Sequence, residues 1–370
     1  MDAKKTPLYH SFINRGAKIR NAGGYYAPIA FSDPKTEHLT TREKAGLFEI
    51  FGQFLVEVTG RDAERLINET HIADVTKLPD MKGTYCGILN ERGCFLDDVI
   101  TWRVNARKFW VCPAPHRVGV IVDHLKAAGQ ELEANVVSLG YRYTSLSIQG
   151  PQSRACLQAM TDADLSNEAL KPFEIVETSL NGVDDVIISR TGFTGELGYE
   201  LFIPTQNAED LYDAILEQGA DKGLVPCGVA AMVSLRIEKR YPIFGRDITE
   251  ANNPVEAGLG WTIRAKEVAY TGKVSIEALK SSGTEQELVL IEMPEGADAP
   301  EAGIELSVEG QHVGRVTSAA MGHSVGRALA MGYVTSALAN NGQTINVGHA
   351  QSAKIHTGPI YDPQNKRSRG

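Results

Sequence analysis

The segment from Arg190 to Glu200, Arg-Thr-Gly-Phe-Thr-Gly-Glu-Leu-Gly-Tyr-Glu, combines groups that could hold a flat polar ligand. Its three glycines recur at every third residue and lie between two strand-like runs, 186–188 and 199–203. Glycine allows positive φ and a close approach of another molecule to the backbone. A tight turn here could present Phe193 as a stacking face and Glu200 as an acceptor for paired N–H donors. An ordinary hairpin, in which the glycines serve only the turn, is the alternative.

Two adjacent carboxylates, Asp97 and Asp98, follow the apolar residues 94–96 at the start of a predicted strand. Because successive strand residues point to opposite faces, one carboxylate should face inward and the other outward. An inward carboxylate could stabilise developing positive charge or relay a proton. Two solvated acids at the entry of a strand are the alternative, since aspartate is seldom buried.

Five motifs occur in order along the chain, and together they resemble the aminomethyltransferase family, typified by the T-protein of the glycine cleavage system. The motifs are Thr6–Tyr9, Tyr85–Asp98, Arg190–Glu200, Ser234–Tyr241 with the following Gly245–Ile248, and Glu256–Trp261. The resemblance extends to about Tyr333. It implies an α+β fold whose three domains form a cloverleaf around a central folate channel, and an enzyme that transfers a one-carbon unit to tetrahydrofolate.

The resemblance also implies roles for individual residues. Asp97 matches the acid near the reactive nitrogens of tetrahydrofolate and is the predicted catalytic residue. Glu200 matches the glutamate that accepts hydrogen bonds from the pterin edge, and Phe193 occupies a position where the family usually has tyrosine. Tyr85, which matches a position lining the folate channel, and Arg236 complete the predicted folate-binding set.

Three departures from T-proteins favour their demethylating relatives. T-proteins continue from Gly-Leu-Phe into Asp-Val-Ser-His-Met, whereas residues 49–54 read Glu-Ile-Phe-Gly-Gln-Phe. Met232 replaces a family arginine, and Pro113 replaces a family asparagine. The runs 234–239 and 359–363 are similar to the folate domains of dimethylglycine and sarcosine dehydrogenases. The main prediction is therefore a tetrahydrofolate-dependent transferase that demethylates a small amine, sulfonium or methoxy compound and passes the carbon to folate.

Aromatic residues near the altered segment indicate where such a donor would bind. A sulfonium or quaternary ammonium ion is stabilised by aromatic faces. The predicted substrate-binding residues are accordingly Tyr25, Tyr26, Phe51 and Phe54. The alternative is a strand whose phenylalanines fill the core.

Three other functions stay open. The first is the aminomethyltransferase (T-protein) activity of glycine cleavage itself. The second is the folate-binding subunit of a flavin-dependent N-demethylating oxidase, which needs a separate flavoprotein partner because this chain has no Rossmann fingerprint for a flavin. The third is a folate-binding protein that supports iron–sulfur cluster assembly, but residues 266–273 lack the cysteine of that motif.

Composition narrows the classes of partner. A net charge of −9 argues against nucleic acid and anionic membranes, which select basic surfaces. The sequence also has no apolar run long enough to span a membrane and no signal peptide, so a cytoplasmic enzyme is expected. The five cysteines form no C-x-x-C pair and the nine histidines show no metal-ligand spacing, so buried free thiols and no metal site are predicted.

The pattern of elements predicts how these residues are positioned. Helical periodicity covers residues 118–128, 208–218 and 229–238, a strand is expected at 54–58, and a hairpin turns at 105–108. Beyond a polar linker after Ser281, short strands broken by proline and glycine predict a small β-barrel. The predicted domains are 1–50 with 140–235 (folate-binding α+β), 51–139 with 236–280 (second α+β) and 285–370 (C-terminal β-barrel).

Overall fold

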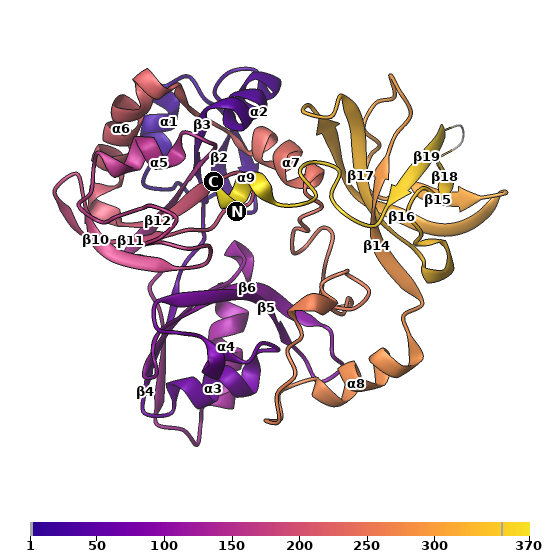
Figure 1. Ribbon diagram of the computed structural model, residues 1–370, viewed down its shortest axis with the longest axis horizontal. Coiled ribbons are helices and arrows are strands. Elements are labelled where there is room, and N and C mark those ends of the chain that lie inside the picture. The colour runs from indigo at the N-terminus through magenta and orange to yellow at the C-terminus, as the bar shows by residue number, and fades with distance from the viewer. Residues whose placement is uncertain (1–2, 349–350) are drawn as a thin grey trace.

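The computed structural model describes residues 3–348 and 351–370, and Figure 1 shows three lobes around a common centre. Two lobes combine a sheet with helices, and the third is a closed barrel. The predicted fold class, α+β with a C-terminal β-barrel, is confirmed. The domain boundaries stay a prediction, although the first sheet does draw its strands from both sides of the second lobe in sequence.

A six-stranded sheet forms the first lobe, in the order β10-β11-β12-β9-β3-β13, and only the β13–β3 pair is parallel. Its strands are β3 (Ala45–Glu49), β9 (Tyr143–Gln149), β10 (Ile175–Leu180), β11 (Val183–Ser189), β12 (Gly198–Pro204) and β13 (Leu224–Pro226). Strands β11 and β12 are the two runs predicted on either side of the glycine tract. The tract is therefore the turn of a hairpin.

Helices cover both faces of this sheet. An apolar core joins the strands to α1 (Tyr9–Asn14), α5 (Ser153–Gln158) and α6 (Ala208–Gly219). On the opposite face lie α2 (Pro34–Glu43) and α7 (Val229–Glu238), which contact each other, and α7 packs on β3 through a smaller apolar cluster. A two-stranded hairpin, β1 (Lys18–Ala22) with β2 (Tyr25–Ala30), contacts α7.

The second lobe is a five-stranded antiparallel sheet in the order β5-β6-β7-β4-β8. Its strands are β4 (Val56–Gly60), β5 (Lys82–Leu89), β6 (Phe95–Asn105), β7 (Lys108–Cys112) and β8 (Ala134–Ser138). Helices α3 (Ala63–Thr70) and α4 (Val118–Ala128) pack on one face through an apolar core. The other face meets the first sheet through a buried cluster that contains Trp102, Trp110 and Phe202. The two sheets thus enclose a shared interior.

The third lobe is a barrel in the order β14-β17-β16-β15-β18-β19, entered through α8 (Lys273–Ser282). Its strands are β14 (Gln286–Glu292), β15 (Glu305–Val308), β16 (Gln311–Gly322), β17 (Arg327–Thr335), β18 (Thr344–Val347) and β19 (Gln351–His356). The chain then returns to the first lobe, where α9 (Lys366–Arg369) lies (Figure 1).

Short 3₁₀ turns connect several elements: η1 (Val75–Lys77), η2 (Pro115–Arg117), η3 (Thr205–Asn207), η4 (Ala220–Lys222), η5 (Gly260–Thr262) and η6 (Ser336–Leu338). The three predicted helices and the 105–108 turn are confirmed. The strand expected at 54–58 instead runs over β4, so Phe54 lies in the preceding loop. Within the described ranges, no helix is both long and apolar enough to cross a bilayer.

Candidate active site

The two adjacent carboxylates lie on β6, where the strand register separates them. Asp97 pairs with Ile88 of β5 and Asp98 with Gly87, so their side chains leave opposite faces of the sheet. Asp97 is fully buried, and its Oδ2 accepts a 2.8 Å hydrogen bond from the backbone N–H of Ala114. Asp98 is half-buried, and its Oδ2 accepts a 2.7 Å hydrogen bond from the hydroxyl of Tyr85.

Burial makes both carboxyls weaker acids than an exposed aspartate. It raises the pKa of Asp97 well above its ordinary value, and the neighbouring charge of Asp98 adds to the effect. Burial raises the pKa of Asp98 to about 6, although the Tyr85 hydroxyl favours the charged form. A carboxyl such as that of Asp98, whose pKa lies near neutrality, can hold or release a proton during a reaction.

The prediction that one aspartate faces solvent is wrong. The faces do alternate, but both faces of this sheet are covered, one by helices and the other by the first lobe. The Asp98 face is the one that carries Tyr85 and Ile100 and packs toward the first lobe. Asp98 therefore joins Asp97 as a candidate catalytic residue.

Glu200 lies in a row of residues that crosses the first sheet. It pairs with Ser189 on β11 and with Ser147 on β9, which in turn pairs with Phe48 on β3. Glu200 is 5% exposed, and its Oε2 accepts a hydrogen bond from the Thr191 hydroxyl. Burial raises its pKa, while this hydrogen bond lowers it. The row presents one carboxylate among hydroxyls on the face opposite the main apolar core.

Each glycine of the tract has a close neighbour that excludes a side chain. A Cβ on Gly192 would lie 2.0 Å from the Gln149 side-chain oxygen, and one on Gly198 would lie 2.2 Å from its nitrogen. A Cβ on Gly195, where φ is +84°, would meet the Lys239 side chain at 2.4 Å. The Gln149 amide also bonds Ser147, Thr191 and Thr194. The three glycines thus let the backbone of the turn pack closely against the side chains of Gln149 and Lys239.

Cys112 lies where the two sheets pack against each other. It pairs with Ile100 across β6 and β7 and belongs to the cluster between the lobes. Burial raises the pKa of the Cys112 thiol, and the negative charges of Glu200 and Asp97 raise it further. Glu200 shares a sheet face with Phe202 of this cluster, and Asp98 shares a sheet face with Trp102 of the same cluster, so both carboxylates lie on the faces along which the two lobes meet.

Arg236 connects the site to the barrel. Its side chain is fully buried, and Nη1 donates to Asp247 Oδ2 at 2.6 Å. Asp247 Oδ1 accepts hydrogen bonds from Thr317 at 2.6 Å and Ser318 at 2.5 Å, both on β16. The nitrogens Nε and Nη2 of Arg236 are buried without an acceptor among the described residues. A folate contact for Arg236 stays a prediction, while its link to Asp247 fixes α7 against the barrel.

Phe193 and Tyr85 each have an aromatic neighbour. The rings of Phe193 and Tyr241 have centroids 5.8 Å apart with an interplanar angle of 31°. Tyr85 and Trp261 show a similar arrangement at 6.0 Å and 31°, and the Trp261 side chain is 58% exposed. Both tilted pairs offer flat apolar faces near the carboxylates.

The four residues predicted to form a substrate cage are not brought together. Tyr25 and Phe51 do pair, with ring centroids 6.0 Å apart. Tyr26 instead pairs with Tyr9 at 5.7 Å, and Phe54 pairs with the exposed Tyr141 at 6.4 Å. Phe51 and Phe54 lie in a loop rather than on a strand, and their side chains pack against different aromatic neighbours. Only Tyr25 and Phe51 could face a common ligand.

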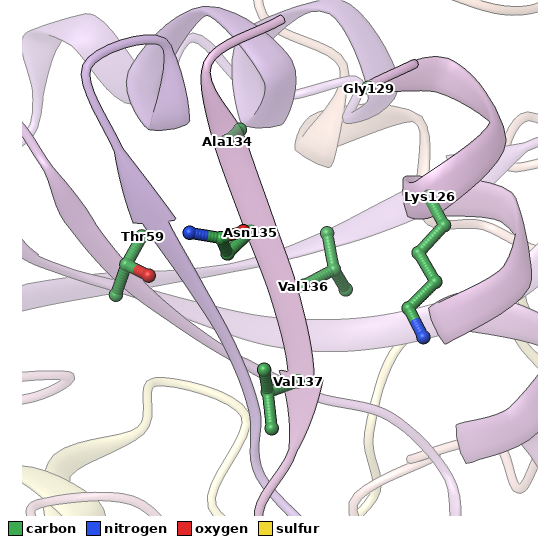
Figure 2. Close-up of a pocket in the computed structure, with 7 residues that line it drawn as sticks. All are labelled: Thr59, Lys126, Gly129, Ala134, Asn135, Val136 and Val137. Atoms are coloured by element: carbon green, nitrogen blue, oxygen red, sulfur yellow. The ribbon is translucent and has the colours of Figure 1, made fainter.

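Two surface cavities lie away from these residues. A cavity of about 440 Å³ is lined by β4, α4 and β8, as Figure 2 shows for Thr59, Lys126 and Val137. A second cavity of about 370 Å³ lies between residues 80–81 and 163–176. No predicted site residue lines either cavity. Among residues 3–348 and 351–370, no group of His, Cys, Asp or Glu has the clustering of a metal site.

Two buried acceptors lack a donor. Among the described residues, Asp97 Oδ1 and Gln53 Oε1 are buried without a hydrogen-bond partner, and Glu200 accepts a single hydrogen bond, at Oε2. Buried polar atoms are normally satisfied, so a ligand that carries N–H donors fits this centre. Asp98, Gln149, Gln53 and Cys112 were missed from the sequence, because only the strand register and the packing between lobes bring them to the site.

Comparison with known proteins supports a relationship over the whole length. The GCVT N-terminal domain matches residues 8–267, and the glycine cleavage T-protein C-terminal barrel domain matches residues 286–362. An aminomethyltransferase from Symbiobacterium thermophilum is 30% identical, with 98% of this chain and 99% of the relative covered. One from Shouchella clausii is 34% identical, with 87% of each covered.

Structural comparison agrees. The crystal structure of glycine cleavage system aminomethyltransferase T from Bartonella henselae superposes with a TM-score of 0.90 at 28% identity, covering 98% of this chain and 99% of that one. The resemblance to this family and the expectation of a folate-dependent transferase are therefore confirmed, whereas placement in a demethylating branch is not. Its motifs, its three lobes and its relatives agree: the chain belongs to the GCVT family of aminomethyltransferases.

Proposed function

We propose that the protein is a tetrahydrofolate-dependent aminomethyltransferase with the T-protein activity of glycine cleavage. The observation that carries this proposal is that Glu200 and Asp98 lie on the two sheet faces that meet in the buried cluster of Trp102 and Phe202 between the lobes. Relatives that match nearly the whole chain bear the name aminomethyltransferase. They favour this function over the demethylase that the altered 49–54 segment led us to expect.

The unsatisfied acceptors suit a pterin. A pterin edge carries adjacent N–H donors, which a carboxylate such as Glu200 can accept in pairs. Bound tetrahydrofolate would supply the ring nitrogens that receive the one-carbon unit. Asp98 would hold or release a proton beside them through its contact with Tyr85, and a catalytic role for Asp97 stays a prediction. The cover of both sheets by neighbouring lobes would exclude water.

Demethylation of a small methylated compound is the second candidate, and the Tyr25–Phe51 ring pair favours it. Two aromatic faces stabilise a sulfonium or quaternary ammonium ion, and Phe51 replaces part of the Ser-His-Met segment of T-proteins. Pro115 lies against the same loop, because a Cβ on Gly52 would meet it at 3.2 Å. A flavoprotein partner and a cytoplasmic location remain predictions.

A donor competition separates the two functions. The enzyme and tetrahydrofolate are incubated either with aminomethylated lipoyl carrier protein or with a panel of methylated amines, sulfoniums and methoxy compounds. We expect ammonia release and methylene-tetrahydrofolate, detected by mass spectrometry, only with the carrier protein. Methyl-tetrahydrofolate from a small donor, without ammonia from the carrier, would establish the demethylase instead. The Phe51→Ala variant serves as the probe of the ring pair, since only the demethylase should lose activity with it.

A further inference from the structure

Glu196 lies in the middle of the glycine turn, and residues outside the turn donate hydrogen bonds to its carboxylate. Its side chain is 1% exposed. Oε1 accepts hydrogen bonds from Arg42 Nη1 at 2.9 Å and from the Tyr361 hydroxyl at 2.7 Å, and Oε2 accepts one from Arg367 Nε at 2.7 Å. We call these four residues, Arg42, Glu196, Tyr361 and Arg367, the clamp.

The segment 361–370 supplies half of the clamp and is linked to the turn at two other points, directly at Arg190 and indirectly through Lys239. After leaving the barrel it crosses to the first lobe, where α9 lies (Figure 1). Lys239 Nζ donates to the Asp362 carbonyl at 2.7 Å and to Asn365 at 2.8 Å, while its stem covers Gly195. Arg190, at the start of the turn, donates to the Arg369 carbonyl at 2.6 Å.

The clamp holds the turn through buried charged groups. The Arg42 guanidinium lies 3.7 Å from the centroid of the Tyr361 ring and also pairs with Glu238 at 2.7 Å. These charged groups are almost fully buried, apart from Arg367, whose side chain is 40% exposed. A shift of the turn would leave the Glu196 carboxylate without its donors in a buried environment, which is strongly unfavourable.

We infer that Tyr361 and Arg367 are positioning residues for folate binding, which act through Glu196 on the turn that carries Phe193 and leads into Glu200. This inference rests on the proposed function. The turn is short, its glycines fit onto Gln149 and Lys239, and the clamp fixes its midpoint. Loss of the clamp should therefore disturb the Phe193 face and the Glu200 carboxylate together, while Asp98 on the second lobe keeps its place.

Arg367 offers a direct test, because it is exposed enough to be replaced without unfolding the chain. Arg367→Met should weaken tetrahydrofolate binding about tenfold in calorimetry, roughly 1.4 kcal/mol, with an unchanged KM for the donor. Arg367→Lys should restore part of the affinity, because it returns the charge without the fixed fork. Lys366→Ala is the matched control: it removes the same charge from the same turn of α9, where Lys366 has no side-chain contact with Glu196.

Hydrogen–deuterium exchange of the ligand-free protein separates this inference from the proposed function. Amides of residues 191–198 should exchange faster in Arg367→Met than in wild type, and Lys366→Ala should match wild type. Unchanged exchange and unchanged folate affinity in Arg367→Met would overturn the inference. If wild-type protein binds no tetrahydrofolate, the proposed function fails, and the folate role of the clamp fails with it, whereas the exchange result still reports whether the clamp holds the turn.

Discussion

At the scale of single residues, we expect substitutions of the two adjacent aspartates to have different kinetic effects. Asp98 bonds Tyr85 and has a pKa near 6, whereas Asp97 is buried more deeply with one oxygen unsatisfied. We expect Asp98→Asn to lower kcat about a hundredfold or more, as for a group used in proton transfer, with little change in KM. Asp97→Asn should act on both constants, because Asp97 also holds the Ala114 amide. Equal losses in kcat alone for the two variants, in steady-state assays, would contradict this division.

Glu49, at the end of β3, gives a residue-scale prediction about pH. Burial raises its pKa to about 8 from an ordinary value of 4.5, with Thr6 nearby opposing the rise, and its Oε2 has no partner among the described residues. Between these values the folded state binds more protons than the unfolded state, so stability falls as pH rises from about 4.5 to about 8. The slope reaches at most about 1.4 kcal/mol per pH unit.

Urea unfolding at several pH values checks this sign. Glu49→Gln, which stays neutral, should remove the fall in stability and be most stabilising relative to wild type at pH 8. Glu217→Gln on the exposed side of α6 is the control, because its carboxyl is solvated in both states. Parallel pH curves for wild type and Glu49→Gln would exclude a buried neutral Glu49.

At the scale of elements, the glycine turn makes a prediction about packing. Gly198→Ala places a methyl group 2.2 Å from the Gln149 amide, which must move or break its bonds to Ser147 and Thr191. Overpacking of this kind costs about 1–3 kcal/mol, measured by denaturant unfolding. The double variant Gly198→Ala/Gln149→Ala should lose less stability than the sum of the losses of the two single variants, because the two sites are coupled. Gly119→Ala, in open space on α4, should be neutral or stabilising.

The sequence predicts elements better than it predicts their neighbours. Periodicity located α4 and α7, and the glycine spacing located the hairpin turn, because these depend on local rules. It placed Asp98 on the solvent side, because alternation alone does not reveal that both faces of a sheet are covered. The Tyr26 and Phe54 directions were missed for the same reason: a loop and a hairpin set them, and neither follows a period.

At the scale of the whole molecule, Arg42 on α2 links the first lobe to the barrel and to the segment 361–370. Besides Glu196 and Glu238, it bonds the Thr194 carbonyl at 2.8 Å and Ser324 of the barrel at 3.2 Å. Arg42→Met would remove a buried cation that pairs with both Glu196 and Glu238, so we expect a loss of about 3–5 kcal/mol. Calorimetry should show the barrel melting apart from the rest.

An exposed ion pair supplies the comparison for this prediction. Arg15→Met removes the ion pair with Asp213. The Arg15 side chain is 37% exposed and that of Asp213 is 54% exposed, so the loss of stability should be at most about 1 kcal/mol. A similar, small effect of both substitutions would mean that the buried network adds little to the union of the lobes.

The clamp also sets an order of events during synthesis. Tyr361 follows Glu196 by 165 residues, and Arg367 follows it by 171. A growing chain that has completed the first two lobes therefore holds Glu196 and Arg42 without their later partners, and its glycine turn is unsecured until the barrel has been made and the segment beyond it has left the ribosome. We therefore expect a nascent chain to bind its ligand well only after translation has passed the barrel. A chain interrupted within the barrel should bind folate weakly.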